Sequence, residues 1–216
     1  MNRLHGLAVS LTLVAVLAAC TPGPSPSATP EAKPKPTTSA SKPTASPTAT
    51  PSATAAPAPA PLTLPDCETM LPIATARDLF SENTEFLGEI APTDFVARLS
   101  VPSLPSVLAA ASPARGCFWG VPQSDGLFQL VVASITAGQR ATLEGELAGS
   151  GYSTATMGTV TGYDLEGMNE VGSTGTTHLF TGEVWIVCDG TSVGLSGAVA
   201  GSALDALRTG NPTLGL

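Results

Sequence analysis

The sequence predicts an α+β fold, with a mainly antiparallel sheet of about five to six strands, helices packed on it, and a disordered linker before it. Short apolar segments occur in pairs joined by turn residues, which is typical of hairpins. Helical segments are interposed between these pairs, which favours α+β architecture. All ten aromatic residues lie in residues 66–216. About 150 residues are enough for a single domain that buries roughly 68–70% of its unfolded surface.

The first part of this domain is expected to be helical. Residues 72–80 and 103–111 each mix apolar and polar positions over about two turns, and the second segment ends near a Ser-Pro pair. Residues 81–101 give no clear element, because Pro92 and Pro102 break the region into loop and partial turns.

Apolar runs predict six strands. Their expected ranges are residues 116–121, 127–135, 152–157, 160–167, 174–180 and 184–188. In the last of these, Val184, Ile186 and Cys188 share one face while Trp185 and Val187 share the other. Because both faces are apolar, we expect this strand to be central in the sheet.

Two further helices are predicted. Thr136 and Gln139 have the spacing of a capping box, so a helix is expected from there to about residue 148. A final helix is expected over about residues 198–208, with Gly210 and Pro212 just beyond its end.

The charge of the domain excludes several classes of partner. Residues 66–216 contain five arginines, no lysine and sixteen acidic residues, so the net charge is 5 − 16 = −11. Nucleic acids, anionic lipids and anionic wall polymers require clustered positive charge, which this balance does not offer. We expect no nucleic-acid partner, and solubility near a negatively charged surface explains the acidity best.

The N-terminus has the three parts of a secretory signal. Arg3 precedes a mostly apolar run over residues 4–17, followed by Ala18 and Ala19. The run is too short to span a bilayer, which takes roughly 20 residues. Leu17-Ala18-Ala19-Cys20 resembles the lipobox of bacterial lipoproteins. That resemblance implies removal of a signal peptide, residues 1–19, and a diacylglyceryl thioether on the Cys20 sulfur. The domain is therefore expected at the outer face of the plasma membrane, held there by acyl chains.

Residues 20–65 are expected to form a disordered tether. Pro, Ser, Thr and Ala make up nearly all of the segment, so it has too little apolar surface to offset the entropy of ordering. Its prolines favour extended polyproline II of about 3.1 Å per residue, or a reach of at most ~140 Å. We expect the tether to act as a plain spacer rather than as a proline motif that a partner recognises. The sequence is compatible with a tether that is glycosylated on its threonines and with one that is not.

Three cysteines follow Cys20: Cys67, Cys117 and Cys188. Outside the membrane a disulfide is expected, but three thiols allow three single bridges. We favour Cys67–Cys117, which would join the entry segment to the first predicted strand, with Cys188 as a buried thiol. Metal binding is not expected, because the spacings are wide and the domain has one histidine.

Two short motifs resemble a known group of proteins. Cys67-Glu68-Thr69-Met70-Leu71 and Gly116-Cys117-Phe118-Trp119 are similar to segments of small extracytoplasmic domains in actinobacterial lipoproteins and outside mycobacterial sensor kinases. The resemblance implies a role in ligand sensing or envelope interaction, and no known reaction.

No catalytic constellation is predicted. Residues 190–194 match the G-x-S-x-G pattern around Ser192, but His178 precedes this serine and no histidine follows it, against the order that the nucleophile elbow requires. His178 is more consistent with a satisfied or surface sheet residue. Asp164, Glu166 and Glu170 are more typical of a solvated face than of a carboxylate pair for acid–base catalysis or of a cation site.

The function predicted from the sequence is a non-enzymatic binding or sensing module without a cofactor or metal. The alternative is a structural or interaction protein of the envelope. Trp119 and Trp185 are core residues by default, but either would be the preferred contact for a partner if it lined a groove.

Overall fold

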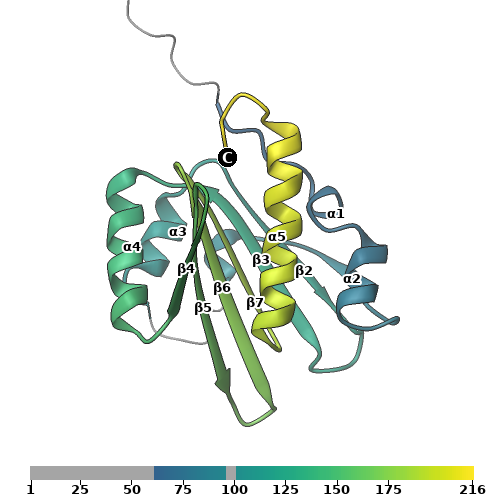
Figure 1. Cartoon of the computed structure of the whole chain (residues 1–216). Helices are drawn as coiled ribbons and strands as arrows, with labels where there is room; N and C mark the ends of the chain where they lie inside the picture. Colours follow the sequence, from purple (N-terminus) through teal and green to yellow (C-terminus); the bar gives the residue numbers. More distant parts are fainter. Residues whose placement is uncertain (1–60, 96–100) are drawn as a thin grey trace, which may run out of the picture. The chain divides into compact units, whose positions relative to one another are not determined.

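The computed structural model describes residues 61–95 and 101–216 (Figure 1). In this part of the chain seven strands form one sheet, in the order β1-β2-β3-β7-β6-β5-β4, and every neighbouring pair is antiparallel. The strands are β1 Glu85–Ile90, β2 Ala114–Gly120, β3 Leu127–Ser134, β4 Ser153–Met157, β5 Val160–Met168, β6 Ser173–Thr181 and β7 Val184–Gly190. The α+β class is confirmed, but the predicted number of five to six strands is wrong.

The missed strand is β1, which forms one edge of the sheet. Its pairing with β2 shifts register between Phe86 and Gly88, and Gly88 has a φ of +129°. Burial alternates along the strand, but Leu87 is an exposed apolar residue and Gly88 has no side chain, so the sequence does not show the alternation of apolar and polar residues from which a strand is recognised. The strand is also only half covered, so its apolar residues do not form a continuous run.

The helices in the described residues are α1 Cys67–Met70, α2 Ile73–Leu79, α3 Leu104–Ala110, α4 Ala137–Gly149 and α5 Val193–Gly210, with a 3-10 turn, η1, at Pro92–Asp94. The capping box of α4 is confirmed. The Gln139 N–H donates to Thr136 Oγ1 at 3.2 Å, and the Thr136 N–H donates to Gln139 Oε1 at 2.8 Å.

Helix α5 begins five residues earlier than the sequence predicts. The Ser192 hydroxyl caps it by accepting a hydrogen bond from the Leu195 N–H at 3.2 Å. Its first turn lies directly on β6 at Gly175, where an added Cβ would collide with the backbone of Ser192 and Val193. A glycine at this position is therefore required for the close approach of α5 to the sheet.

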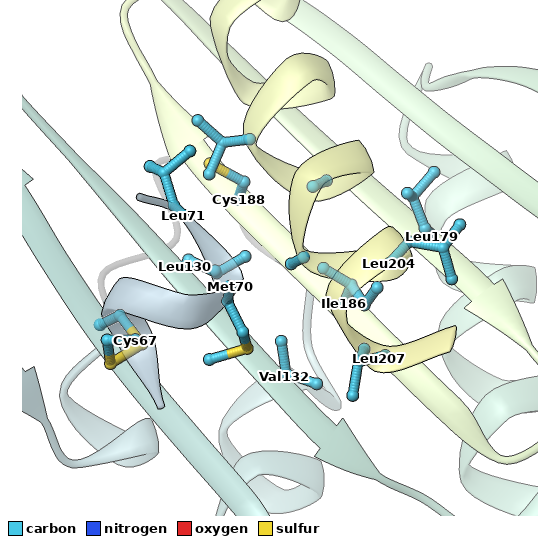
Figure 2. Packing of buried hydrophobic residues seen from close by; sticks show 14 of the residues in the cluster. Cys67, Met70, Leu71, Leu130, Val132, Leu179, Ile186, Cys188, Leu204 and Leu207 are labelled. Atoms are coloured by element: carbon cyan, nitrogen blue, oxygen red, sulfur yellow. A yellow bond between two sulfur atoms is a disulfide. The ribbon is translucent and has the colours of Figure 1, made fainter. Parts of the chain in front are cut away.

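The sheet is covered on both faces, by α1, α2 and α5 on one side and by α3 and α4 on the other (Figure 1). Figure 2 shows the core under α5. There, residues of the α1 segment and α5 lie over the sheet: Met70, Leu71, Leu204 and Leu207 over Leu130, Val132, Ile186 and Cys188. Strand β7 is the middle strand, and all seven of its residues are buried, so the prediction that it is central is confirmed.

The entry segment is attached to the domain by covalent and polar links. A disulfide joins Cys67 of α1 to Cys117 of β2, which confirms the favoured pairing. The Thr63 N–H donates to Asn211 Oδ1 at 2.8 Å, and Asn211 Nδ2 donates back to the Thr63 carbonyl at 2.9 Å. The domain therefore begins a few residues before position 66, where the sequence analysis places the boundary between tether and domain.

The third cysteine, Cys188, is a free and buried thiol. Burial and the nearby Asp189 raise its pKa.

Candidate functional site

The most suitable binding site is a groove between α5 and the strands at the β4 end of the sheet. Helix α5 covers β6 and β7 closely and β5 much less, so the sheet extends beyond the helix on this face. The hollow that results has a volume of about 450 Å³, within the usual range for small-molecule sites of about 300–1,000 Å³. We call it the α5 groove. Its lining residues are Met157, Val160, Asp164, Thr177, Leu179, Gly197, Gly201, Leu204, Asp205 and Arg208.

Two glycines of α5 keep the groove open. Gly197 and Gly201 are one helical turn apart, so they lie on the same face of the helix. An added Cβ at Gly201 would meet no atom within 4 Å, and one at Gly197 would meet only Thr177 Oγ1, at 3.7 Å. Larger side chains at these positions would therefore enter the groove rather than the core.

A chain of hydrogen bonds lines the sheet side of the groove. The Thr177 hydroxyl donates to Asp164 Oδ1 at 2.6 Å, and the Ser196 hydroxyl lies 2.9 Å from Thr177 Oγ1. Because the Thr177 proton is directed to the carboxylate, Ser196 donates to Thr177. Thr177 and Ser196 are buried, while Asp164 is half-buried at the groove. The carboxylate is thus held in a fixed orientation and keeps an oxygen for a further donor.

The rim of the groove near the end of α5 carries opposite charges. Arg208 Nη1 lies 3.5 Å from Asp205 Oδ1, and Arg208 Nε donates to the Leu216 carbonyl at 2.9 Å. Both side chains are exposed, Asp205 more than Arg208, so this ion pair contributes little to stability. The groove therefore offers an apolar floor, an oriented carboxylate at Asp164 and a charged rim.

A second hollow is a less suitable site. It has a volume of about 480 Å³ and is lined partly by Pro61 and Leu62 and by Leu214 and Leu216 near the C-terminus. Its polar side chains, Ser112, Ser134 and Glu183, form no hydrogen-bonded group comparable to that of the α5 groove.

His178 lies on the opposite face of the sheet, within an aromatic cluster. Trp185 Nε1 donates to His178 Nδ1 at 3.2 Å, and the two rings stack with centroids 5.9 Å apart. Phe180 stacks on the other two rings, and Tyr152 packs edge-on against His178. Burial lowers the pKa of His178 to about 3, so the imidazole is neutral at physiological pH. Burial, with the charge of Asp189, raises the pKa of Tyr152 to about 12.

These positions determine what the remaining candidates can do. Ser192 serves as the helix cap, and His178 lies under the helices of the other face, so the G-x-S-x-G segment is not associated with this histidine. Asp164 takes part in the α5 groove, whereas Glu166 and Glu170 are not among the residues that line it. In residues 61–95 and 101–216 no group of three or more histidine, cysteine or acidic side chains has the arrangement of a metal site.

The two tryptophans predicted as possible contacts are both core residues. Trp119 has an exposed fraction of 0% and lies between Phe86 and Phe128, with ring centroids 5.4 and 5.6 Å away. Trp185 is equally buried. Neither lines the α5 groove.

The chain has no match among protein-family models, curated proteins or solved structures. No helix in the described part of the chain combines the length and apolar character needed to cross a bilayer. Cys20, the predicted signal peptide and most of the predicted tether lie outside the described residues.

Of the residues that line the groove, the sequence indicated only Asp164 as a candidate, and it favoured a solvated face for that residue. The available signal was Gly197 and Gly201, spaced four apart in a helix that began too late in the prediction to include the first of them. The spacing indicates a close approach or an open space on one helix face, but it does not say which.

Proposed function

We propose that this protein is a lipid-anchored extracytoplasmic binding module that holds a small, largely apolar ligand in the α5 groove and carries out no reaction on it. The single observation that carries the proposal is the combination, in one hollow of about 450 Å³, of an apolar floor with a carboxylate oriented by buried hydroxyls. Ligand sites generally have this composition, because apolar contact supplies affinity and a few fixed polar groups supply orientation.

The lining indicates the chemistry of the ligand. Val160, Leu179 and Leu204 provide apolar contact, while Asp164 provides an acceptor whose orientation Thr177 fixes. The best-matched ligand has an apolar body and a hydrogen-bond donor or cationic group at one end. The net charge of −11 over residues 66–216 disfavours an anionic ligand.

The proposed location rests on the Leu-Ala-Ala-Cys segment and on the disulfide. Cys20 follows a signal-like segment and resembles a lipidated cysteine. The Cys67–Cys117 disulfide supports an oxidising compartment, where such bonds persist. A binding module at the outer face of the membrane accounts for both features.

The proposal that no reaction occurs rests on the position of the candidate groups. A serine nucleophile is typically activated by an adjacent general base. Ser192 caps α5, whereas His178 is neutral, accepts a hydrogen bond from Trp185 and is buried on the other face of the sheet. The groove itself contains Asp164 and Asp205 but no histidine, cysteine or lysine.

Native mass spectrometry of protein extracted from its own membranes tests the ligand. Gly201→Leu would place a side chain in the groove, whereas Gly145→Leu, on the exposed face of α4 where an added Cβ meets nothing within 4 Å, is the matched control. We expect a bound mass on the wild type and on Gly145→Leu that is lost from Gly201→Leu. A bound mass retained by both variants, or absent from the wild type, would contradict the proposal.

One observation favours the alternative, an interaction protein of the envelope. The end of the β5–β6 hairpin carries two apolar side chains in solvent: Met168, the last residue of β5, with an exposed fraction of 80%, and Val171 in the turn, with 73%. Exposed apolar groups at the end of a hairpin are a suitable contact for another protein. Under this alternative, replacing both by serine abolishes capture of an envelope partner, while Gly201→Leu has no effect on it.

A further inference from the structure

Strand β4 forms the edge of the sheet opposite β1 and has no protection against pairing with another strand. All five of its residues, Ser153–Met157, are exposed. No charged residue and no proline occurs anywhere from residue 147 to residue 163. An edge strand of this kind presents free N–H and C=O groups and is a template for a further strand.

The other edge of the same sheet is protected. Strand β1 carries Glu85 and Glu89, and its register shift lies next to Gly88. Charges and bulges are the usual means by which an edge avoids unwanted pairing. Because one edge has both devices and β4 has neither, the open edge of β4 is a distinct feature of this domain.

The register of the β4–β5 hairpin identifies the free backbone groups. Met157 pairs with Val160 across a two-residue turn, and Gly158 begins this turn with a φ of +62°. The two residues that flank such a turn form a hydrogen-bonded pair, and non-hydrogen-bonded and hydrogen-bonded pairs then alternate along the hairpin. Ser153, Ala155 and Met157 therefore direct their backbone groups to β5, whereas Thr154 and Thr156 direct theirs outward.

We propose that β4 pairs antiparallel with β4 of a second copy of this chain, about a two-fold axis at Ala155. Thr154 of each copy then lies opposite Thr156 of the other, and each of these two pairs exchanges two backbone hydrogen bonds. Ala155 lies opposite its own counterpart in a non-hydrogen-bonded pair. The two sheets become one continuous sheet across the dimer.

A second copy fits this edge better than a different partner for two reasons. A two-fold interface must be self-complementary, and Thr154-Ala155-Thr156 reads the same in both directions, so each of these three residues meets one of the same type, while Ser153 lies opposite Met157 at the ends of the strand. Facing threonines are favourable cross-strand neighbours. The second reason is charge, because two domains of net charge −11 repel, and their contact is least costly where both surfaces are neutral.

Disulfide trapping of Ala155→Cys tests this pairing in the full-length chain, in the cells that express it. In a non-hydrogen-bonded antiparallel pair the Cα atoms are about 4.5 Å apart, which is within the range that a disulfide spans. We expect mild oxidation to convert the monomer band of Ala155→Cys into one of twice the mass. The wild type measures the background from the native cysteines, and Leu87→Cys on the exposed part of β1 is the matched control for the other edge.

The register and the role of the edge are tested by further variants. Thr154→Cys and Thr156→Cys are each expected to remain monomeric alone but to form a mixed dimer when expressed together. Adding Thr156→Lys to Ala155→Cys is expected to abolish trapping, with an unchanged urea midpoint showing that the domain still folds. A folded Ala155→Cys chain that stays monomeric would overturn the proposal, and so would trapping to a different protein or trapping that Thr156→Lys leaves intact.

Discussion

Acidification between about pH 7.5 and pH 5 is expected to destabilise the folded domain through His178. The imidazole is fully buried, and its pKa is lowered from 6.5 to about 3, whereas in the unfolded chain it titrates near its ordinary value. Between these two pKa values the unfolded state binds the additional proton. The free energy of unfolding therefore falls as the pH falls through about 6.5 towards 3, and this loss is absent above about pH 7.5.

The magnitude follows from the two pKa values. At about pH 5 the unfolded imidazole is almost fully protonated and the folded one is neutral, which gives a loss of about 2 kcal/mol relative to pH 7.5. This figure hardly changes for any folded pKa below about 4, because the folded state is neutral at pH 5 in every such case. The loss continues to grow below pH 5 and approaches about 5 kcal/mol only below pH 3, where the folded imidazole is also protonated.

Urea unfolding followed by tryptophan fluorescence measures this effect, because both tryptophans are buried in the folded state. His178→Gln is the matched variant, since it keeps an acceptor for the Trp185 N–H and has no proton to gain. Carboxylates contribute equally to both proteins, so the difference between their pH dependences isolates the histidine. Equal losses in the two proteins between pH 7.5 and 5 would refute the reasoning, as would an NMR titration of His178 with a midpoint above pH 5.

Three other changes have expected outcomes. Replacing Cys67 and Cys117 together by alanine opens a loop with a sequence separation of 50 and is expected to lower the unfolding free energy by about 2–4 kcal/mol, measured in urea; an unchanged midpoint would contradict this. Gly201→Ala and Gly145→Ala each fill open space on a helix and are expected to stabilise by about 0.5–1 kcal/mol, while only Gly201→Ala weakens ligand binding; equal effects on binding would count against the groove. Cys20→Ser is expected to move the protein from the membrane fraction to the soluble fraction, and continued membrane association would show that the anchor lies elsewhere.

Local patterns predicted the parts of the fold that depend on neighbouring residues. The capping box at Thr136 and Gln139 located the start of α4, because both hydrogen bonds form within one turn. The apolar residues on both faces of 184–188 predicted a central strand, because only a strand covered on both sides buries them all. The Cys67–Cys117 pairing was favoured because it attaches the entry segment to a strand.

Three features were not predicted: strand β1, the start of α5 and the α5 groove. Strand β1 was missed because the exposed Leu87 and the adjacent Gly88 hide the alternation of apolar and polar residues in the sequence, although burial alternates along the strand. The start of α5 was missed because Gly194 and Gly197 lower the helix propensity of its first turns, and packing on the sheet at Gly175 compensates for this. The α5 groove forms because the chain passes from β3 through α4 to β4 at the far edge and then returns strand by strand to β7 beside β3, which places β5 and β4 beyond the helix. No local pattern encodes this arrangement.

Whether the α5 groove holds a ligand is tested most directly by a crystal structure of the protein purified from its own membranes. We expect non-protein electron density beside Gly197 and Gly201, with its polar end at Asp164. A groove that contains only ordered water, in a sample to which native mass spectrometry assigns a bound molecule, would contradict this assignment of the site.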